Sequence, residues 1–483
     1  MNLTFLIIAI ILLMPFAWYK PKIAVLTSVF LLYMNIPVIG KKFFGVPEFL
    51  AGSVVVLLLL PQLIHTMLRR EKLIVDDVFG LMCIFLAVLF ASSFAAKDVS
   101  VAWGWIFVYL TEGLVLYFLV FNAIRDMEML RRTIWVLLLA GSLQGSLSLY
   151  QDVTRSVDNT FYGFAQREVE VEELDLSTVA KSTFEREKIG GKDRASGPIG
   201  ETNRYAQILI MILPFAVLLI LGRASSRMTK LLAAGAAMLI LSGILLTFSR
   251  GGFLTLVLML MLLIFLREIR PHQAIGVVSV IVLLMVFAAP GFFSRVDTLR
   301  GVQALFSDTA PVRADGATRG RTVEMLAAFN VFLDHPLLGV GPGQYVPFYS
   351  EKYHLNQDNA LRHIPRPRRA HSLYAELAAE TGLIGSIVFM WIAAVVINRL
   401  WRLRLQAQRS HPEIASLSTA FLFCMFGYLV NAIFLHFAFQ RYYWFLLAMT
   451  SAAIHIFQTE LQSRRYSPPL ASNEVKPQLP AST

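Results

Sequence analysis

The residues best suited to chemistry are arginines and one histidine that lie in polar stretches between long apolar runs. Arg250 belongs to the first stretch, residues 247–252, where only a tight turn separates two apolar runs. A guanidinium at the level of lipid headgroups can bind a pyrophosphate through two parallel hydrogen bonds, or it can simply anchor a helix end at the membrane interface. We expect Arg250 to bind an anionic lipid-linked group, and the two glycines after it to let another group approach closely.

A second polar stretch combines two arginines with a glycine-rich turn. Residues 322–333 have the spacing of an amphipathic helix, and Arg319 and Arg321 come just before them. Pro336 and the glycines that follow are expected to end this helix and shape the backbone. Arg321 can bind an anion or, equally well, form a salt bridge with Glu324 along the helix.

The third stretch leads through His371 into another apolar run. Its arginines, with no acid among them, should attract a polyanion, although anionic headgroups would satisfy them too. A neutral imidazole titrates near working pH, so His371 can act as a general base; otherwise it only begins a helix. Glu376 and Glu380 share one face of that helix, where they orient neighbouring groups or are solvated. The arginines of this stretch are Arg362, Arg366, Arg368 and Arg369.

The fourth stretch, residues 194–205, comes before a further apolar run. Thr202 or Asn203 is expected to cap the helix that begins there. Arg194 and Arg204 add positive charge. The chain has no paired histidine or cysteine spacing of a metal site and no phosphate-loop or serine-triad motif, so we expect neither metal nor cofactor.

The elements that position these stretches are transmembrane helices. Of the 483 residues, 56% are hydrophobic and only 16% are charged. Apolar runs of about 20 residues match the hydrocarbon core of a bilayer. The sequence therefore predicts an all-α integral membrane protein with about 12–13 transmembrane helices and two long extracytoplasmic loops, the second containing short helices. The predicted spanning segments are 2–18, 22–39, 49–68, 75–95, 103–122, 131–150, 205–222, 229–248, 252–266, 274–290, 382–400, 416–434 and 440–458.

Charge in the short loops predicts the orientation. Most of the Lys and Arg residues in short loops fall in one alternate set, which is therefore expected to be cytoplasmic. The net charge of +11 is explained by these loops, so nucleic-acid binding is not expected. The predicted regions are N-terminal helices 1–150, a first extracytoplasmic loop 151–204, central helices 205–290, a large extracytoplasmic loop 291–381, C-terminal helices 382–460 and a disordered cytoplasmic tail 461–483.

Taken in order, the four stretches resemble the O-antigen ligase and polymerase superfamily of bacterial envelope enzymes. The resemblance implies an inverting, metal-independent glycosyltransferase that uses an undecaprenyl-pyrophosphate-linked glycan as donor. It assigns essential arginines to Arg250 and Arg321 and the catalytic histidine to His371. Ser372 departs from the His-Asn pair that the family often has, which affects how the acceptor is positioned. The patterns that carry the likeness are Arg194–Gly197 with Asn203, Thr247–Gly251, Arg321 with His335–Gly341, and His371–Tyr374 with Glu380–Gly385.

We therefore expect a glycan ligase in the bacterial inner membrane, with its active site facing the periplasm or exterior. The expected partners are the lipid-linked donor, a glycan or glycolipid acceptor such as a lipid A core sugar, and membrane lipids. A repeat-unit polymerase and a protein O-oligosaccharyltransferase remain open alternatives, and a transporter of lipid-linked glycan is the alternative from another class. Substrate-binding roles are expected for Arg194, Asn203, Arg319, Arg368, Arg369 and Tyr374.

Overall fold

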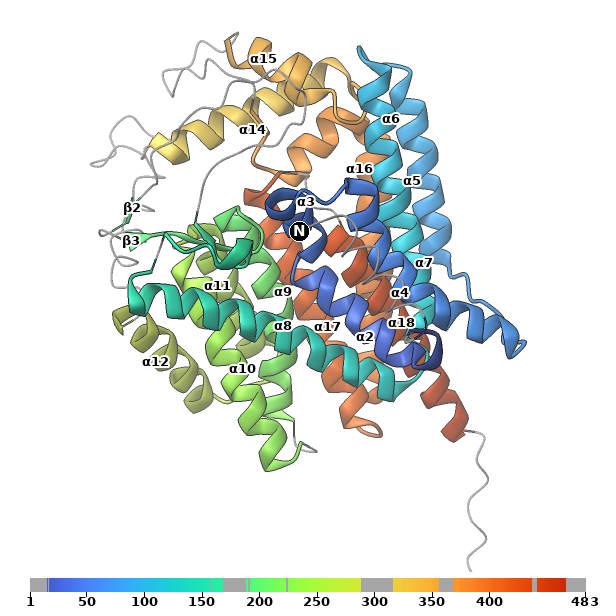
Figure 1. Cartoon of the computed structure of the whole chain (residues 1–483), viewed down its shortest axis with the longest axis vertical. Helices are drawn as coiled ribbons and strands as arrows, with labels where there is room; N and C mark the ends of the chain where they lie inside the picture. Colours follow the sequence, from blue (N-terminus) through green and yellow to red (C-terminus); the bar gives the residue numbers. More distant parts are fainter. Residues whose placement is uncertain are drawn as a thin grey trace, which may run out of the picture.

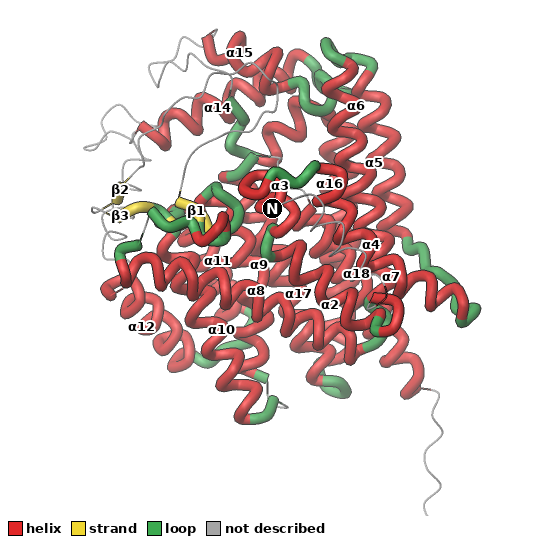
Figure 2. The backbone as a smooth tube through the Cα atoms, viewed as in Figure 1, coloured by secondary structure: helices red, strands yellow, loops and turns green. Residues whose placement is uncertain are grey.

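The structure is a computed structural model that describes residues 15, 17–156, 158–167, 188–189, 192–222, 225–287, 316–355, 368–436 and 441–465. Nearly all of them are helical (Figure 2). The α-helices are α2 (Pro21–Tyr33), α3 (Ile36–Phe44), α4 (Glu48–Leu68), α5 (Asp77–Ser93), α6 (Val99–Val108), α7 (Leu116–Ala123), α8 (Met127–Thr154), α9 (Thr202–Leu221), α10 (Arg227–Leu246), α11 (Arg250–Phe265), α12 (Pro271–Phe287), α14 (Gly316–Asp334), α15 (Glu351–Leu355), α16 (Leu373–Ala407), α17 (Pro412–Asn431) and α18 (Arg441–Arg465).

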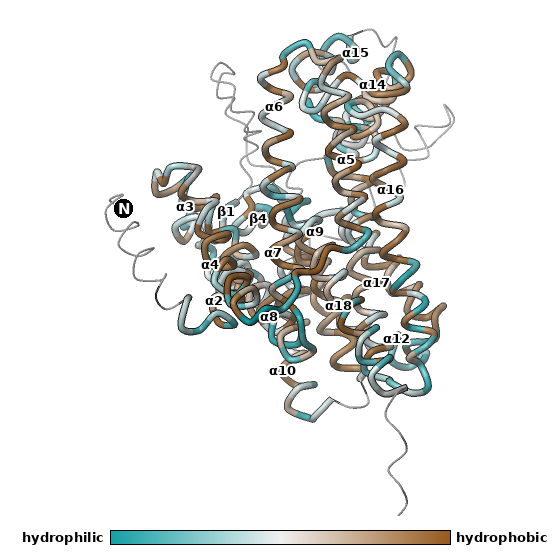
Figure 3. The backbone as a smooth tube through the Cα atoms, turned by 90° about the vertical axis from the view of Figure 1, so that its right-hand side faces the viewer, coloured by the Kyte–Doolittle hydropathy of each residue, from teal (hydrophilic) through white to brown (hydrophobic). Residues whose placement is uncertain are grey.

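The prediction of an all-α integral membrane protein is confirmed. Among the described residues, seven helices are long and apolar enough to cross a bilayer, or eight if the bent pair α2 and α3 forms one span. Three further apolar helices, α5, α11 and α12, are shorter. Every predicted segment from 49–68 to 440–458 coincides with a helix, and apolar residues line these helices (Figure 3). The segment 2–18 lies almost wholly outside the described residues.

Three boundaries differ from the prediction. The segment 22–39 is not one straight helix, because α2 and α3 meet at an angle of 57°. Asn35 at the bend is left-handed (φ 57°), and Pro37 in the first turn of α3 has no N–H to continue the helix of α2. A π-helix, η1 (Tyr109–Val115), joins α6 to α7. At the other end of the chain, α18 continues to Arg465, into the predicted tail, of which residues 466–483 lie outside the description.

Ion pairs join the basic loops that the sequence assigns to one face. Loops at the same face of a membrane protein can contact one another, whereas loops on opposite faces cannot. The pairs therefore support the alternation predicted from charge. They are Lys22–Asp126 (3.1 Å), Arg125–Glu71 (3.1 Å), Arg131–Glu413 (2.6 Å), Arg404–Glu268 (2.7 Å) and Arg399–Asp77.

A cap that contains α14 and α15 covers the opposite end of the bundle, where α14 packs against α16 and α15 (Figure 1). The Asp98 amide of the α5–α6 turn donates to Gln344 Oε1 (3.0 Å), and Gln344 Nε2 donates back to the Asp98 carbonyl (2.9 Å). Lys97 lies over the ring of Tyr349 at 4.2 Å. Between α14 and α15 the chain forms a π-helix, η4 (Val346–Ser350). These contacts hold the predicted large loop against the transmembrane helices.

The first long segment closes through a small antiparallel ladder. Strand β1 (Gln166–Arg167) pairs with β4 (Ala195–Gly197), and β2 (Lys188–Ile189) pairs with β3 (Lys192–Asp193). The Ser196 hydroxyl donates to the Gln166 carbonyl at 2.8 Å. A single-turn 3₁₀ helix, η2 (Phe161–Gly163), precedes β1, and another, η5 (Ala432–Phe434), follows α17. The ladder brings Arg194 to the start of α9.

Helix α16 is interrupted at Gly382, which adopts φ 63° and ψ −164°. The turn after α14 bonds to the backbone there: Val340 N donates to Ala379 O (2.9 Å), and Leu383 N donates to Pro336 O (2.8 Å). The expectation that the glycine-rich turn shapes the backbone is confirmed, since Gly339 is also left-handed (φ 68°). The connection fixes the first two turns of α16, which follow His371.

We predict that Gly382→Ala lowers the free energy of unfolding by about 1–3 kcal/mol, because a side chain is strained at this φ. The added Cβ would also lie 2.3 Å from the Leu337 carbonyl oxygen. Gly276→Ala in α12 is the matched control, since nothing lies within 4 Å of its added Cβ. Thermal unfolding in detergent measures both variants. Equal melting temperatures for Gly382→Ala and wild type would contradict the strained connection.

Candidate active site

His371 lies at the start of α16 and faces a buried carboxylate from α14. Its backbone is left-handed (φ 46°), and Ser372 is the N-cap of α16, with its hydroxyl accepting from Ala375 N. Nδ1 of His371 is 2.7 Å from Oε2 of Glu324 and 3.3 Å from the Arg369 carbonyl oxygen. Glu324 is only 1% exposed. Both contacts involve Nδ1, which lies between two oxygen acceptors.

The charges around His371 set its proton affinity. Burial lowers the pKa of His371, but the Glu324 carboxylate outweighs burial, and the net pKa is raised above its usual value. The positive charge of Arg321 acts in the opposite direction. Burial would raise the pKa of Glu324, yet His371 and Arg368 bring it below its usual value. The pair is therefore a histidine made more basic by an ionised carboxylate.

The arginines just before His371 are matched by buried acids. Arg368 Nη1 lies 3.5 Å from Glu324 Oε1. Arg369 Nη1 donates to Glu376 Oε1 at 2.8 Å, and the second oxygen of Glu376 accepts from the Ala370 amide at 3.2 Å. Of the two open interpretations of Glu376, orientation of neighbouring groups is therefore the one the structure supports. These bonds fix the backbone that leads into His371.

A second histidine–carboxylate pair faces the first. His436, after η5, has Nε2 3.4 Å from Oε2 of Glu201, and its ring meets the His371 ring edge to face at 6.0 Å between centroids. Burial would raise the pKa of Glu201, but His436 and Arg204 bring it to about 2. Burial lowers the pKa of His436 to about 4, despite the neighbouring carboxylate. Near neutral pH the pair is a carboxylate beside a neutral imidazole.

The stretch before α9 contributes Arg194, Glu201 and Asn203. Arg194 is buried and donates from Nε to the Thr247 carbonyl (2.9 Å) and from Nη2 to Asn203 Oδ1 (3.2 Å). The capping prediction is wrong: Glu201 is the N-cap of α9, without a side-chain cap bond, and Thr202 is already helical. The Asn203 side chain accepts a hydrogen bond from Arg194 and does not cap the helix.

Arg250 is the first residue of α11 and is 8% exposed. Ser249 caps the helix by accepting from Gly252 N at 3.2 Å. The predicted close approach is confirmed at Gly251, where an added Cβ would lie 3.1 Å from the Phe434 ring. Phe434 precedes His436 by two residues, and Arg194 bonds to Thr247. The Arg250 turn therefore lies against segments that also carry the second histidine and Arg194.

The remaining predicted residues are distributed around this centre. Arg319 and Arg321 lie in the first turns of α14, and Arg321 acts electrostatically on His371. The Tyr374 hydroxyl donates to the Leu429 carbonyl at 2.7 Å, which fixes α16 to α17. Arg362 and Arg366 lie outside the described residues.

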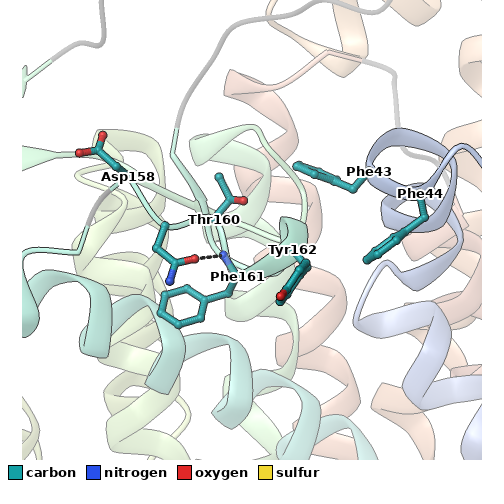
Figure 4. Close-up of a pocket in the computed structure, with 7 residues that line it drawn as sticks. Phe43, Phe44, Asp158, Thr160, Phe161 and Tyr162 are labelled. Atoms are coloured by element: carbon teal, nitrogen blue, oxygen red, sulfur yellow. Dashed lines mark hydrogen bonds between the residues drawn. The ribbon is translucent and has the colours of Figure 1, made fainter. Parts of the chain in front are cut away.

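A solvent-open hollow of about 470 Å³ lies apart from this centre, between the end of α3 and the loop before β1 (Figure 4). Phe43, Phe44, Phe161 and Tyr162 line it, and Tyr162 is 77% exposed. None of the predicted site residues contributes to its wall. In the part of the chain that the structure describes, no group of three or more His, Cys, Asp or Glu side chains is placed to hold a metal ion.

The fold and the site define a multi-pass membrane protein whose arginines, histidines and carboxylates converge where α9, α11 and α16 begin. The family model described as O-antigen ligase matches residues 234–390, so this part of the chain is similar to that family. The match supports a membrane glycan enzyme of the O-antigen ligase or polymerase type. The matched residues include Arg250, Arg321 and His371. No curated protein matched the chain.

Sequence reasoning missed His436, and it paired neither Glu324 nor Glu201 with a histidine. Glu324 was considered as a partner of Arg321, whereas the structure pairs it with His371 and Arg368. His436 stands among apolar residues, 432–435 before it and 437–439 after it, so its immediate sequence does not mark a site. Its place between two spanning segments, on the face predicted to carry the other site residues, was the available signal.

Proposed function

We propose that this protein transfers a glycan from undecaprenyl pyrophosphate to a hydroxyl of an acceptor such as a lipid A core sugar, at the extracytoplasmic face and with inversion. The observation that carries the proposal is the contact between His371 Nδ1 and the buried Glu324 carboxylate at 2.7 Å. A carboxylate that orients an imidazole and raises its basicity is the arrangement a general base needs.

In the proposed reaction, His371 Nε2 takes the proton of the acceptor hydroxyl as its oxygen attacks the anomeric carbon of the donor glycan. The bond from that carbon to the pyrophosphate oxygen breaks, and the pyrophosphate leaves from the face opposite the attack. The configuration of the anomeric carbon therefore inverts. The Glu324 carboxylate stabilises the imidazolium that forms. The products are the glycosylated acceptor and undecaprenyl pyrophosphate.

The leaving group needs positive charge, for which we propose Arg250 and Arg321. Both are arginines, whose planar guanidinium binds phosphate oxygens with two hydrogen bonds. Arg250 also opens α11, and a helix N-terminus favours an anion. Arg194 and Arg319 add charge near the same end of the bundle, whereas Arg368 and Arg369 act through the acids they hold. Asn203 positions Arg194, and Tyr374 positions the start of α16.

The pH dependence of kcat/KM follows from the raised pKa of His371. A general base must be neutral, so activity is expected to fall as the pH drops through this pKa, at a higher pH than for an ordinary histidine. Glu324→Gln removes the carboxylate that raises the pKa, and the acid limb should move to lower pH. An unmoved limb in Glu324→Gln would show that His371 is not the group that titrates.

Reconstitution in liposomes with a radiolabelled undecaprenyl-pyrophosphate glycan tests the function and identifies the acceptor. Purified lipid A–core, unlabelled lipid-linked repeat units and an acceptor protein are offered separately. Label on lipid A–core supports the ligase, label in longer carrier-linked chains indicates a polymerase, and label on the protein indicates an O-oligosaccharyltransferase. Label that changes leaflet while it stays on its carrier would overturn the proposal in favour of transport.

A further inference from the structure

The second histidine–carboxylate pair, His436 with Glu201, has no part in the reaction as described above. His436 is 7% exposed, and its backbone is fixed because Arg204 Nη2 donates to the His436 carbonyl at 2.7 Å. Arg204 also donates from Nη1 to Gln207 Oε1 (2.7 Å), and Gln207 Nε2 bonds to the Tyr428 carbonyl (3.1 Å). These bonds hold the backbone of His436 between α9 and α17.

The two nitrogens of His436 differ in their surroundings. Nε2 faces the Glu201 carboxylate, which can only accept, so the hydrogen of the neutral ring belongs on Nε2. Nδ1 is then a hydrogen-bond acceptor with a lone pair. It is buried, and no donor from the described part of the chain bonds to it. Roughly nine in ten buried polar groups have a partner, so this atom points to a ligand that supplies a donor.

The position of His436 identifies the kind of donor. Its ring meets that of His371 edge to face, with 6.0 Å between centroids and 85° between the planes, so one ligand is within reach of both imidazoles. The Arg250 turn packs on Phe434, two residues away. A sugar carries several hydroxyls on neighbouring carbons. One of them can give its proton to His371 while the next donates to His436.

We propose that His436, oriented by Glu201, binds a second hydroxyl of the acceptor sugar and so selects which hydroxyl His371 deprotonates. The proposal rests on the function proposed above and extends it to acceptor recognition. Because His436 accepts one neutral hydrogen bond from the acceptor and does not contact the leaving group, its loss acts on the KM for the acceptor. The KM for the lipid-linked donor is left nearly unchanged.

The test uses the full-length protein in liposomes, with purified lipid A–core as the acceptor probe. His436→Ala is expected to raise the KM for lipid A–core by about tenfold, as for loss of a neutral hydrogen bond. In His436→Asn the amide oxygen can occupy the place of Nδ1, whereas in His436→Gln the amide lies near the place of Nε2. The asparagine variant should therefore retain more acceptor affinity than the glutamine variant.

The outcomes separate this proposal from the proposed function. An unchanged KM for lipid A–core in His436→Ala overturns the role of His436 in acceptor binding. The proposed function still stands in that case if wild type transfers glycan and His371→Ala does not. A lower KM for lipid A–core in His436→Gln than in His436→Asn also overturns the role in acceptor binding, because pairing with Glu201 would then be the essential contact. If wild type transfers nothing to lipid A–core, binding of that glycolipid to wild type and His436→Ala is compared directly, and equal affinities overturn the proposal. Melting temperatures of all variants check that they fold.

Discussion

Replacing His371 by alanine is expected to lower kcat for glycan transfer by about 100- to 10,000-fold, the range that general bases contribute. The side chain lies at the start of α16 with Nδ1 against Glu324. Its removal takes away the group that we propose accepts the proton of the acceptor hydroxyl. Initial rates of label transfer in liposomes measure the effect.

His411→Ala is the matched control for this prediction. His411 is also a histidine just before a helix, but it lies outside the site and its ring contacts Ser410. The control should transfer at the wild-type rate. If His371→Ala has the melting temperature of wild type and transfers glycan at the wild-type rate, His371 does not act as the base in the reaction.

Arg250→Ala is expected to lower kcat by about 100- to 1,000-fold, as when one donor to a developing negative charge is lost. Arg250→Lys should restore only a part of this rate, because an ammonium group cannot make the two parallel hydrogen bonds of a guanidinium. Both rates are measured with saturating donor, so that the loss reports on the leaving group rather than on binding.

Arg227→Ala provides the comparison, since Arg227 is an exposed arginine at the start of α10, the neighbouring spanning helix. It is expected to match wild type. A full recovery of kcat in Arg250→Lys would indicate that charge alone suffices and that the bidentate assignment is wrong. A loss confined to the donor KM would assign Arg250 to ground-state binding.

Most of the fold was predictable because a bilayer imposes a simple rule on sequence. Each helix must be apolar for its whole length, and each loop must carry polar residues, so the segments from 49–68 onward are visible in hydropathy alone. What hydropathy could not show was the bend at Asn35 and the break in α16 at Gly382. Both depend on single residues with left-handed backbones inside apolar runs.

Candidate site residues could be named from the sequence only where residue type and local sequence coincide. Arg250, Arg321 and His371 could be named because each lies in a short local pattern of arginine, glycine or histidine residues. Glu324, Glu201 and His436 come from three separate elements, and only tertiary contacts bring them to the histidine pair. A single sequence does not reveal such pairs, because nothing local distinguishes a buried carboxylate in a helix from a solvated one.

Glu112 is an acidic residue within the predicted spanning segment 103–122. It lies in the π-helix η1, where Arg441 Nη1 bonds to it at 3.0 Å. Arg441 Nη2 also donates to Asn35 Oδ1 at 2.9 Å, at the bend between α2 and α3. The acid is therefore paired within the fold, and it gives no support to a charged transport path.

The central claim is that the glycan leaves its pyrophosphate carrier in a reaction that needs His371. The most direct test measures released undecaprenyl pyrophosphate and glycosylated acceptor in the same liposome reaction. We expect one carrier molecule released for each glycan transferred by wild type, and neither product above background with His371→Ala. Glycan that moves while its carrier stays attached, or equal release from both proteins, would contradict the account.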